Sequence, residues 1–213
     1  MMNLKSIFSI VFLLFLISCT EKKTGNIIIK KKQPAVEKLA PALFISGDFN
    51  GDKATDTIFE SYQSSITHKE ISKLHDSINW DNDLDLTIKS KPVTTLYSSD
   101  KSIEKFMVSD HPQQKGVYLF ANLGDINDDG KDEFGYAVDW ADFSSLNTYH
   151  IMTLKQGSFI EIFQFPIHES MSIPEGKDFD PKDLIKKTSK KTIRYNYVDL
   201  AEVDIRQALH TFK

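Results

Sequence analysis

The chain carries one short acidic loop twice, and this repeat constrains the fold more than any other feature of its sequence. The segment from Leu43 to Asp56 and the segment from Leu123 to Glu133 align without a gap from a shared Gly-Asp pair onward. A repeat of this kind predicts two copies of one supersecondary unit. The equivalent loop residues are Asp48 and Asp125, Asn50 and Asn127, Asp52 and Asp129, and Asp56 and Glu133.

Oxygen-bearing side chains at positions 1, 3, 5 and 9 of such a loop can converge on one cation. Ca²⁺ prefers about six to eight oxygen ligands, and backbone carbonyls such as those of Ala54 and Lys131 can add to the side chains. Gly130 at position 6 permits a sharp bend in the second loop, whereas Lys53 stands there in the first. Neither loop contains His or Cys, which disfavours zinc and copper. The alternative is a pair of Asx-rich turns that bind no metal.

The sequence around the loops predicts strands. An EF-hand needs a Glu at position 12 and flanking helices, but Phe59 and Tyr136 stand there. From Phe134 to Trp140 large apolar residues alternate with Gly, Ala and Asp, which is the period of a strand. We therefore predict a mainly β fold with one or two short helices. The expected strands are Thr57–Tyr62, Leu84–Ile88, Val93–Tyr97, Val117–Ala121, Glu133–Trp140, Thr148–Leu154, Phe159–Phe165, Thr192–Val198 and Glu202–Ile205.

Two helices are expected outside the loops. Thr67 and Glu70 fit a capping box ahead of apolar residues at helical spacing, Ile71, Leu74 and Ile78. Asp180 and Pro181 could begin a second short helix. Two further groups of residues are expected to have a structural role and not a functional one. The acidic residues are predicted to form a turn that enters a strand: Asp81, Asp83 and Asp85. The aromatic residues are predicted to lie in the core: Trp80, Trp140, Tyr136 and Tyr149.

The order strand, D-x-N-x-D-G-x-x-D/E, strand resembles the FG-GAP and VCBS-like repeats of the integrin-alpha propeller type. In that family each repeat is a β-propeller blade, and the loop between its first two strands binds Ca²⁺. The resemblance implies that the eight loop residues named above are metal ligands and that the protein serves adhesion or scaffolding. Lys53 and Glu133 depart from the family pattern. Two repeats cannot close a propeller, which needs about four to eight blades. We expect two blade-like antiparallel sheets packed into one compact monomeric domain, residues 42–213.

The N-terminus has the pattern of an export signal. Lys5 precedes an apolar run from Ile7 to Ile17, interrupted only by Ser9, that is too short to span a bilayer comfortably. The run ends at Cys19 in a sequence that resembles the lipobox of bacterial lipoproteins. The resemblance implies cleavage after residue 18, acylation of Cys19 with palmitate-like chains, and membrane anchoring through residues 19–41. The alternative is a retained membrane helix in which Cys19 is incidental.

The composition and the residue after Cys19 bear on where the protein is located and what it binds. Cys19 is the sole cysteine, so the chain cannot form an internal disulfide. A net charge of -4 gives no indication of nucleic-acid binding. Thr20 follows Cys19, and by analogy with Gram-negative lipoproteins the lack of Asp there favours the outer membrane.

Three functions follow from these patterns. The favoured one is a non-enzymatic, calcium-stabilised envelope protein that binds a protein or a glycan. The second is a metal-independent periplasmic interaction or inhibitor lipoprotein. The third and least favoured is a hydrolase that uses acids such as Asp128 and Asp132, because the sequence contains no nucleophile elbow, P-loop or dinucleotide fingerprint.

Overall fold

The computed structural model describes residues 43–71, 73, 79–142, 144–171, 180, 183–202 and 204–213. All of them belong to one compact unit, Pro34–Lys213. The predicted signal peptide and the anchoring segment 19–41, with Cys19, lie outside the described residues. In the described part, no helix is both long enough and apolar enough to cross a bilayer.

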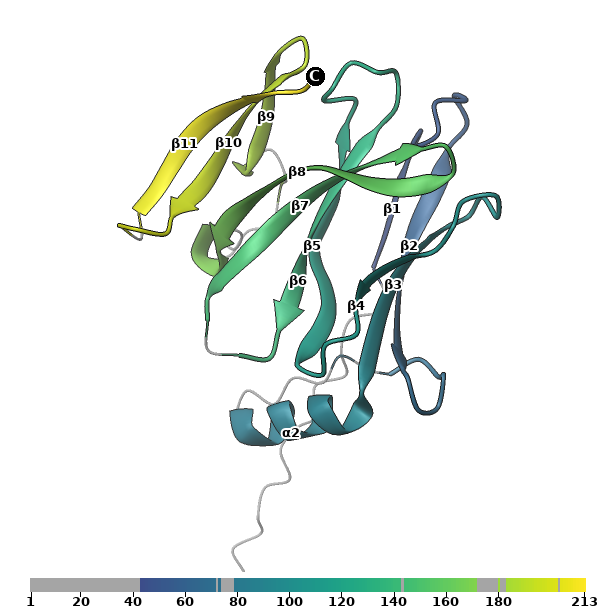
Figure 1. The fold of residues 1–213 in the computed structure, drawn as a ribbon, viewed down its shortest axis with the longest axis vertical. Coiled ribbons are helices and arrows are strands. Elements are labelled where there is room, and N and C mark those ends of the chain that lie inside the picture. The colour runs from purple at the N-terminus through teal and green to yellow at the C-terminus, as the bar shows by residue number, and fades with distance from the viewer. Residues whose placement is uncertain are drawn as a thin grey trace, which may run out of the picture. The chain divides into compact units, whose positions relative to one another are not determined.

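Two four-stranded antiparallel sheets repeat the same meander (Figure 1). Sheet A contains β1 (Phe44–Gly47), β2 (Asp56–Ser64), β3 (Pro92–Ser98) and β4 (Phe106–Ser109) in that order. Sheet B contains β5 (Gln114–Gly124), β6 (Glu133–Trp140), β7 (Leu146–Lys155) and β8 (Ser158–His168), again in sequence order. Each acidic loop joins the first and second strands of its sheet. The prediction of a mainly β fold with two blade-like sheets is therefore confirmed.

A third antiparallel sheet, sheet C, follows sheet B in the chain. A short 3-10 helix, η1 (Glu169–Met171), comes directly after β8. Sheet C then contains β9 (Ile185–Ser189), β10 (Thr192–Asp199) and β11 (Asp204–Thr211), with β10 in the centre. The sequence predicted β10 almost to its full length, but the predicted strand Glu202–Ile205 overlaps β11 only at residues 204 and 205, and a separate third sheet was not predicted.

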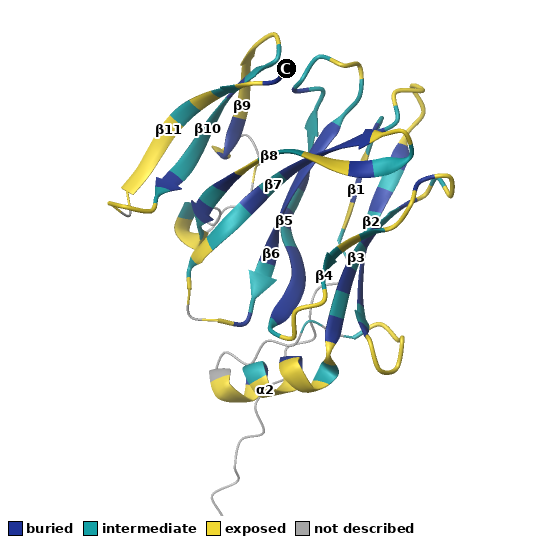
Figure 2. Ribbon diagram, in the orientation of Figure 1, coloured by how far each residue is buried: buried dark blue, intermediate teal, exposed yellow. Residues whose placement is uncertain are grey.

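Sheet B supplies side chains to both hydrophobic clusters, and buried residues run along its central strands (Figure 2). Successive side chains of a strand point to opposite faces of its sheet. Phe134 and Tyr136 accordingly join the cluster with Ile58 of sheet A. Tyr149 of the neighbouring strand joins the cluster with Ile193 of sheet C. The predicted burial of Tyr136 and Tyr149 is confirmed, with 3% and 0% of their surfaces exposed.

The prediction of a strand at Leu84–Ile88 is wrong, because these residues lie in the helix α2 (Trp80–Ser90). The side chain of Asn79 caps the helix by accepting a hydrogen bond from the amide of Asn82 at 3.2 Å. Asp81 and Asp83 lie in the first turn, where the helix dipole favours negative charge. The predicted acidic turn is thus the first turn of a helix.

The predicted helix that starts at Thr67 does not begin with a capping box. Residues 65–67 form a turn, and Glu70 makes an isolated bridge with Gln63 of β2. One carboxylate oxygen of Glu70 accepts hydrogen bonds from the side chains of Ser61 and Gln63. Leu74, Ile78 and Pro181, on which the two helix predictions also depended, lie outside the described residues.

Candidate metal centres

The two acidic loops, called loop 1 (residues 48–55) and loop 2 (residues 125–132), have positive φ angles at the same two positions. Position 4 is Gly51 in loop 1 and Asp128 in loop 2, with φ of 83° and 59°. Position 6 is Lys53 and Gly130, with φ of 69° and 87°. Left-handed backbone is disfavoured for residues other than Gly, Asn and Asp. Lys53 nevertheless takes the conformation that Gly130 takes in the second copy.

Loop 1 folds around its own acids. The two carboxylate oxygens of Asp48 accept hydrogen bonds from the amides of Gly51 and Lys53, at 2.9 and 3.0 Å. The side-chain oxygen of Asn50 accepts one from the amide of Asp52 at 2.9 Å. These Asx turns place the side chains of positions 1, 3 and 5 around one short stretch of backbone.

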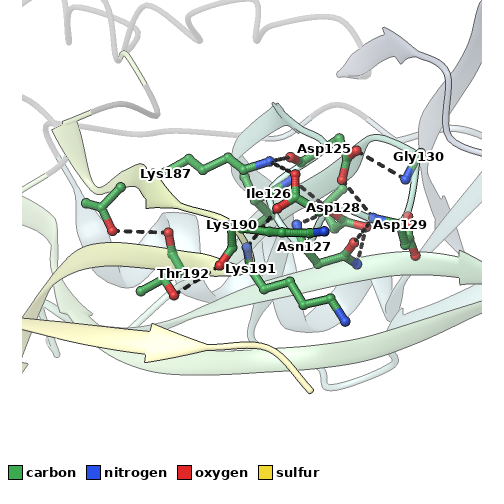
Figure 3. Close-up of polar contacts among 12 residues, drawn as sticks. Asp125, Ile126, Asn127, Asp128, Asp129, Gly130, Lys187, Lys190, Lys191 and Thr192 are labelled. Carbon is green, nitrogen blue, oxygen red and sulfur yellow. Dashed lines mark hydrogen bonds and ion pairs between the residues drawn. The ribbon is translucent and has the colours of Figure 1, made fainter.

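Loop 2 repeats this arrangement with small differences (Figure 3). Asp125 accepts hydrogen bonds from the amides of Asp129 and Gly130, both at 3.1 Å. The same amide of Asp129 also donates a hydrogen bond to the side-chain oxygen of Asn127 at 2.8 Å. Asp129 in turn accepts from the amide of Lys131 at 3.1 Å. The sequence repeat is therefore also a repeat of local structure.

Position 9 of loop 2 lies beneath the loop. Glu133 has 0% of its surface exposed. One of its carboxylate oxygens accepts from the side chains of Asn127 and Thr153, at 2.8 and 3.0 Å. The other accepts from the amides of Ile126 and Asn127, at 3.1 and 3.3 Å. A carboxylate has about four acceptor positions, so this one is saturated. Burial raises the pKa of Glu133 to about 7.

Position 9 of loop 1 is different. Asp56 is 7% exposed, and its Oδ2 atom has no hydrogen-bond partner among the described residues. Burial raises the pKa of Asp56, and the nearby carboxylate of Asp52 raises it further. A buried carboxylate oxygen without a donor is costly, and a cation would compensate it. Asp56 therefore leaves an oxygen for a metal ion where Glu133 does not.

The two loops contact each other through Asp132, a residue that the sequence did not single out as a ligand. The amide of Asp48 donates to the carboxylate of Asp132 at 3.0 Å, and the amide of Asp132 donates back to the carbonyl of Asp48 at 2.8 Å. Asn122 of β5 donates to the same carboxylate and to the carbonyl of Ser46, both at 2.9 Å. Loops 1 and 2 thus form one acidic region.

Loop 2 also binds sheet C through its fourth residue (Figure 3). The ammonium group of Lys187 lies 2.6 Å from Asp128 Oδ1 and 2.5 Å from the carbonyl oxygen of Asp125. The amide of Lys191 donates to the other carboxylate oxygen of Asp128 at 2.9 Å. The hydrogen bond from Lys187 lowers the pKa of Asp128. Asp128 and Asp132, the pair considered for hydrolysis, are held by separate contacts.

The loop 1 residues fit a calcium ion better than the loop 2 residues do. Among the described residues, no group of three or more His, Cys, Asp or Glu side chains is close enough to hold a metal. Amide and backbone oxygens also coordinate Ca²⁺, so a cation in loop 1 would have to draw Asp48, Asp52 and Asp56 closer together, with Asn50 as a further ligand. Loop 2 offers Asp125, Asn127 and Asp129, but its ninth position is saturated.

The fold and the loops define a class of protein: a mainly β domain with two blade-like sheets, each carrying an Asp/Asn-rich loop between its first two strands. Comparisons with protein-family models, with curated proteins and with solved structures found no match to this chain. The function is therefore argued from the residues themselves.

Proposed function

We propose that the protein is a lipid-anchored, non-enzymatic envelope protein whose two acidic loops bind Ca²⁺ and thereby stabilise a binding or adhesion module. The observation that carries this proposal is the buried Oδ2 of Asp56, which no described residue hydrogen-bonds and which the charges of Asp52 and Asp48 also affect. The shared backbone conformation of loops 1 and 2 extends the proposal to the second loop. A bound calcium ion would supply positive charge to an acidic region and hold both loops in place.

The test is a thermal melt of the full chain in mild detergent, with chelator and with millimolar Ca²⁺. A ligand that binds only the folded state stabilises it by about 2.7 kcal/mol at 100 times its dissociation constant. For a chain of this size we expect a rise in Tm of roughly 5–10 °C. Asp48→Asn and Asp125→Asn keep one turn-forming oxygen but remove a charge, so each variant should lose part of this rise.

Asp85→Asn is the matched control, because Asp85 is an exposed acid on α2 outside both loops. This variant should keep the full calcium response. Equal melts of the wild-type chain with and without Ca²⁺ would contradict the proposal and leave the loops as Asx turns.

The anchoring part of the proposal rests on the lipobox-like pattern at the end of the apolar N-terminal run, which places Cys19 as the acylated residue. Labelled palmitate should enter the wild-type chain in bacterial cells and should not enter the Cys19→Ser variant. Fractionation should place the chain in the envelope, in the outer membrane if the source is Gram-negative. Equal labelling of both chains would contradict acylation at Cys19.

A second candidate is a metal-independent interaction protein of the periplasm. It is favoured by one observation: the ligand oxygens of loop 2 already accept amide hydrogen bonds, and the ammonium of Lys187 binds the loop's fourth residue. The same calcium melt separates the two candidates. A hydrolase stays the least favoured prediction, and assays on ester, glycoside and peptide substrates test it.

A further inference from the structure

β11 is an outer strand of sheet C with exposed aliphatic side chains. It is eight residues long, and among the strands that the structure describes it has one neighbour in its sheet, β10. Ile205 and Leu209 are 60% and 66% exposed. An exposed edge of this length is a template for pairing with another strand, and monomeric proteins normally protect such edges.

The other sheet edges in the described part of the chain carry protective features. In sheet A, β1 and β4 are four residues long. In sheet C, β9 has five residues and two exposed lysines, Lys186 and Lys187. In sheet B, β8 contains Pro166, and the pairing of β5 with β6 has three irregularities. Short strands, charges, Pro and bulges are the known devices against edge pairing. β11 contains the charged residues Asp204 and Arg206, but the face that carries Ile205, Gln207 and Leu209 has no charge, and the strand has no Pro and no bulge.

The backbone of β11 is oriented for pairing. In an antiparallel pair, hydrogen-bonded and non-hydrogen-bonded residue pairs alternate. The amide of Asn196 on β10 donates to Leu184, on the side away from β11. Asn196 pairs in register with Gln207, so Gln207 does not use its own backbone groups toward β10. Every second residue of β11 therefore presents its backbone N–H and C=O groups to the open edge. These residues include Gln207, and Ile205 and Leu209 two positions to either side of it.

We propose that β11 pairs antiparallel with β11 of a second copy of this chain, about a two-fold axis at Gln207. The pairing would join two copies of sheet C into one six-stranded sheet. This interface is isologous, the commonest kind in soluble oligomers. It does not depend on calcium, and it replaces the expectation of a monomer.

The proposed register is self-complementary on both faces of the sheet. It sets Ile205 of each copy opposite Leu209 of the other, so four exposed aliphatic side chains cover one another around Gln207. On the other face it sets the carboxylate of Asp204 opposite the imidazole of His210, again twice. Directly opposed aliphatic pairs and complementary polar pairs are the contacts that stabilise antiparallel strands.

The neighbouring registers are poorer. Only residues that present backbone groups to the open edge can form hydrogen-bonded pairs there, so the axis must pass through a residue, and the nearest alternatives are Arg206 and Ala208. An axis at Arg206 sets Ile205 opposite Gln207. An axis at Ala208 sets Leu209 opposite Gln207 and brings Arg206 opposite His210. Both registers lose the aliphatic pairing.

Cysteine cross-linking tests the register directly. The full chain with Cys19→Ser, kept in detergent, has no other thiol. In this background Gln207→Cys should give several-fold more dimer with a short bismaleimide than Ile205→Cys or Leu209→Cys alone, because Cα atoms opposed on the axis lie about 5.5 Å apart. A mixture of the Ile205→Cys and Leu209→Cys chains should cross-link efficiently. Equal yields for all four samples would overturn the register.

A charge exchange tests the interface without cross-linking. The double variant Ile205→Lys with Leu209→Lys sets like charges opposite each other, so analytical ultracentrifugation should show monomers. Ile205→Lys with Leu209→Glu sets opposite charges together, so the dimer should return. Leu200→Lys is the control, because Leu200 is 62% exposed but lies in the turn before β11. A wild-type chain that stays monomeric at all concentrations would overturn the proposal, and circular dichroism verifies that each variant is folded.

Discussion

At the scale of single residues, the buried carboxyl group of Glu133 makes stability depend on pH. Its pKa is raised from 4.5 to about 7 in the folded protein, chiefly because it is buried. Between these two values the folded state binds more protons than the unfolded state, so stability falls as pH rises through the window. The loss is at most roughly 3 kcal/mol. Urea unfolding in chelator should therefore give a lower midpoint at pH 7.5 than at pH 5.

Glu133→Gln should flatten this pH dependence, because the amide does not titrate. The exposed Glu104 provides the control, and Glu104→Gln should keep the wild-type slope. An unchanged slope in Glu133→Gln would show that another group titrates.

Replacing Asp56 should affect stability differently in chelator and in Ca²⁺. Its Oδ2 is buried without a donor and lies near the negative charge of Asp52. In chelator, Asp56→Asn removes the buried charge, so the variant should be at least as stable as the wild type. With Ca²⁺ the variant lacks a charged ligand, so its gain in Tm should be smaller. Melts in the two solutions test both halves, and an equal loss of stability in both would contradict the proposed ligand role.

At the scale of elements, one buried ion pair fastens α2 to β5. The ammonium of Lys115 lies 2.8 Å from a carboxylate oxygen of Asp83, and the two side chains are 8% and 3% exposed. Removing one partner of a buried pair costs about 3–5 kcal/mol, whereas replacing both by apolar residues is often neutral. Asp83→Ala should therefore be far more destabilising in urea than the double variant Asp83→Leu with Lys115→Met. Equal losses would show that the pair itself is not what holds the helix.

The contact between loop 2 and sheet C gives a second prediction at this scale. Lys187 connects β9 to both Asp128 and the carbonyl of Asp125. Lys187→Ala should therefore speed hydrogen exchange at the Lys191 amide, which donates to Asp128. Lys186→Ala changes the neighbouring exposed lysine and should leave this exchange rate unchanged. Mass spectrometry of exchanged peptides measures both variants.

The same elements show which parts of the structure the sequence could predict. Alternation, β-branched and aromatic residues and a Gly-bearing hairpin loop predicted the strands of sheet B, and the loop repeat predicted where the two meanders begin. The alternation Leu84, Leu86, Ile88 imitated a strand, but the cap at Asn79 and the two acids of the first turn stabilise a helix there. The contacts made by Asp132 and Lys187 join residues 84 and 59 positions apart. Such long-range pairs leave no local pattern, so these parts of the site could not be predicted.

At the scale of the whole unit, Pro34–Lys213, sheet B joins the two hydrophobic clusters. One face of its strands packs with sheet A and the other with sheet C. Phe134 is 0% exposed. The centroid of its ring lies within 6.0 Å of the ring centroids of three other phenylalanines, each packed edge to face: Phe49, Phe120 and Phe159. Ile193 is its counterpart in the second cluster, also 0% exposed. Because both clusters share one sheet, loss of either should weaken the whole.

We therefore predict that the described sheets unfold in a single transition. Phe134→Ala should lower the free energy of unfolding by about 3–5 kcal/mol and Ile193→Ala by about 2–5 kcal/mol, because each leaves a cavity in a packed core. In both variants, unfolding followed by tryptophan fluorescence and by far-ultraviolet circular dichroism should give coincident curves, the usual test of a two-state transition. If Ile193→Ala instead gives two separated transitions, sheet C folds independently, and its contacts with loop 2 and β8 are too weak to couple it to the rest of the domain.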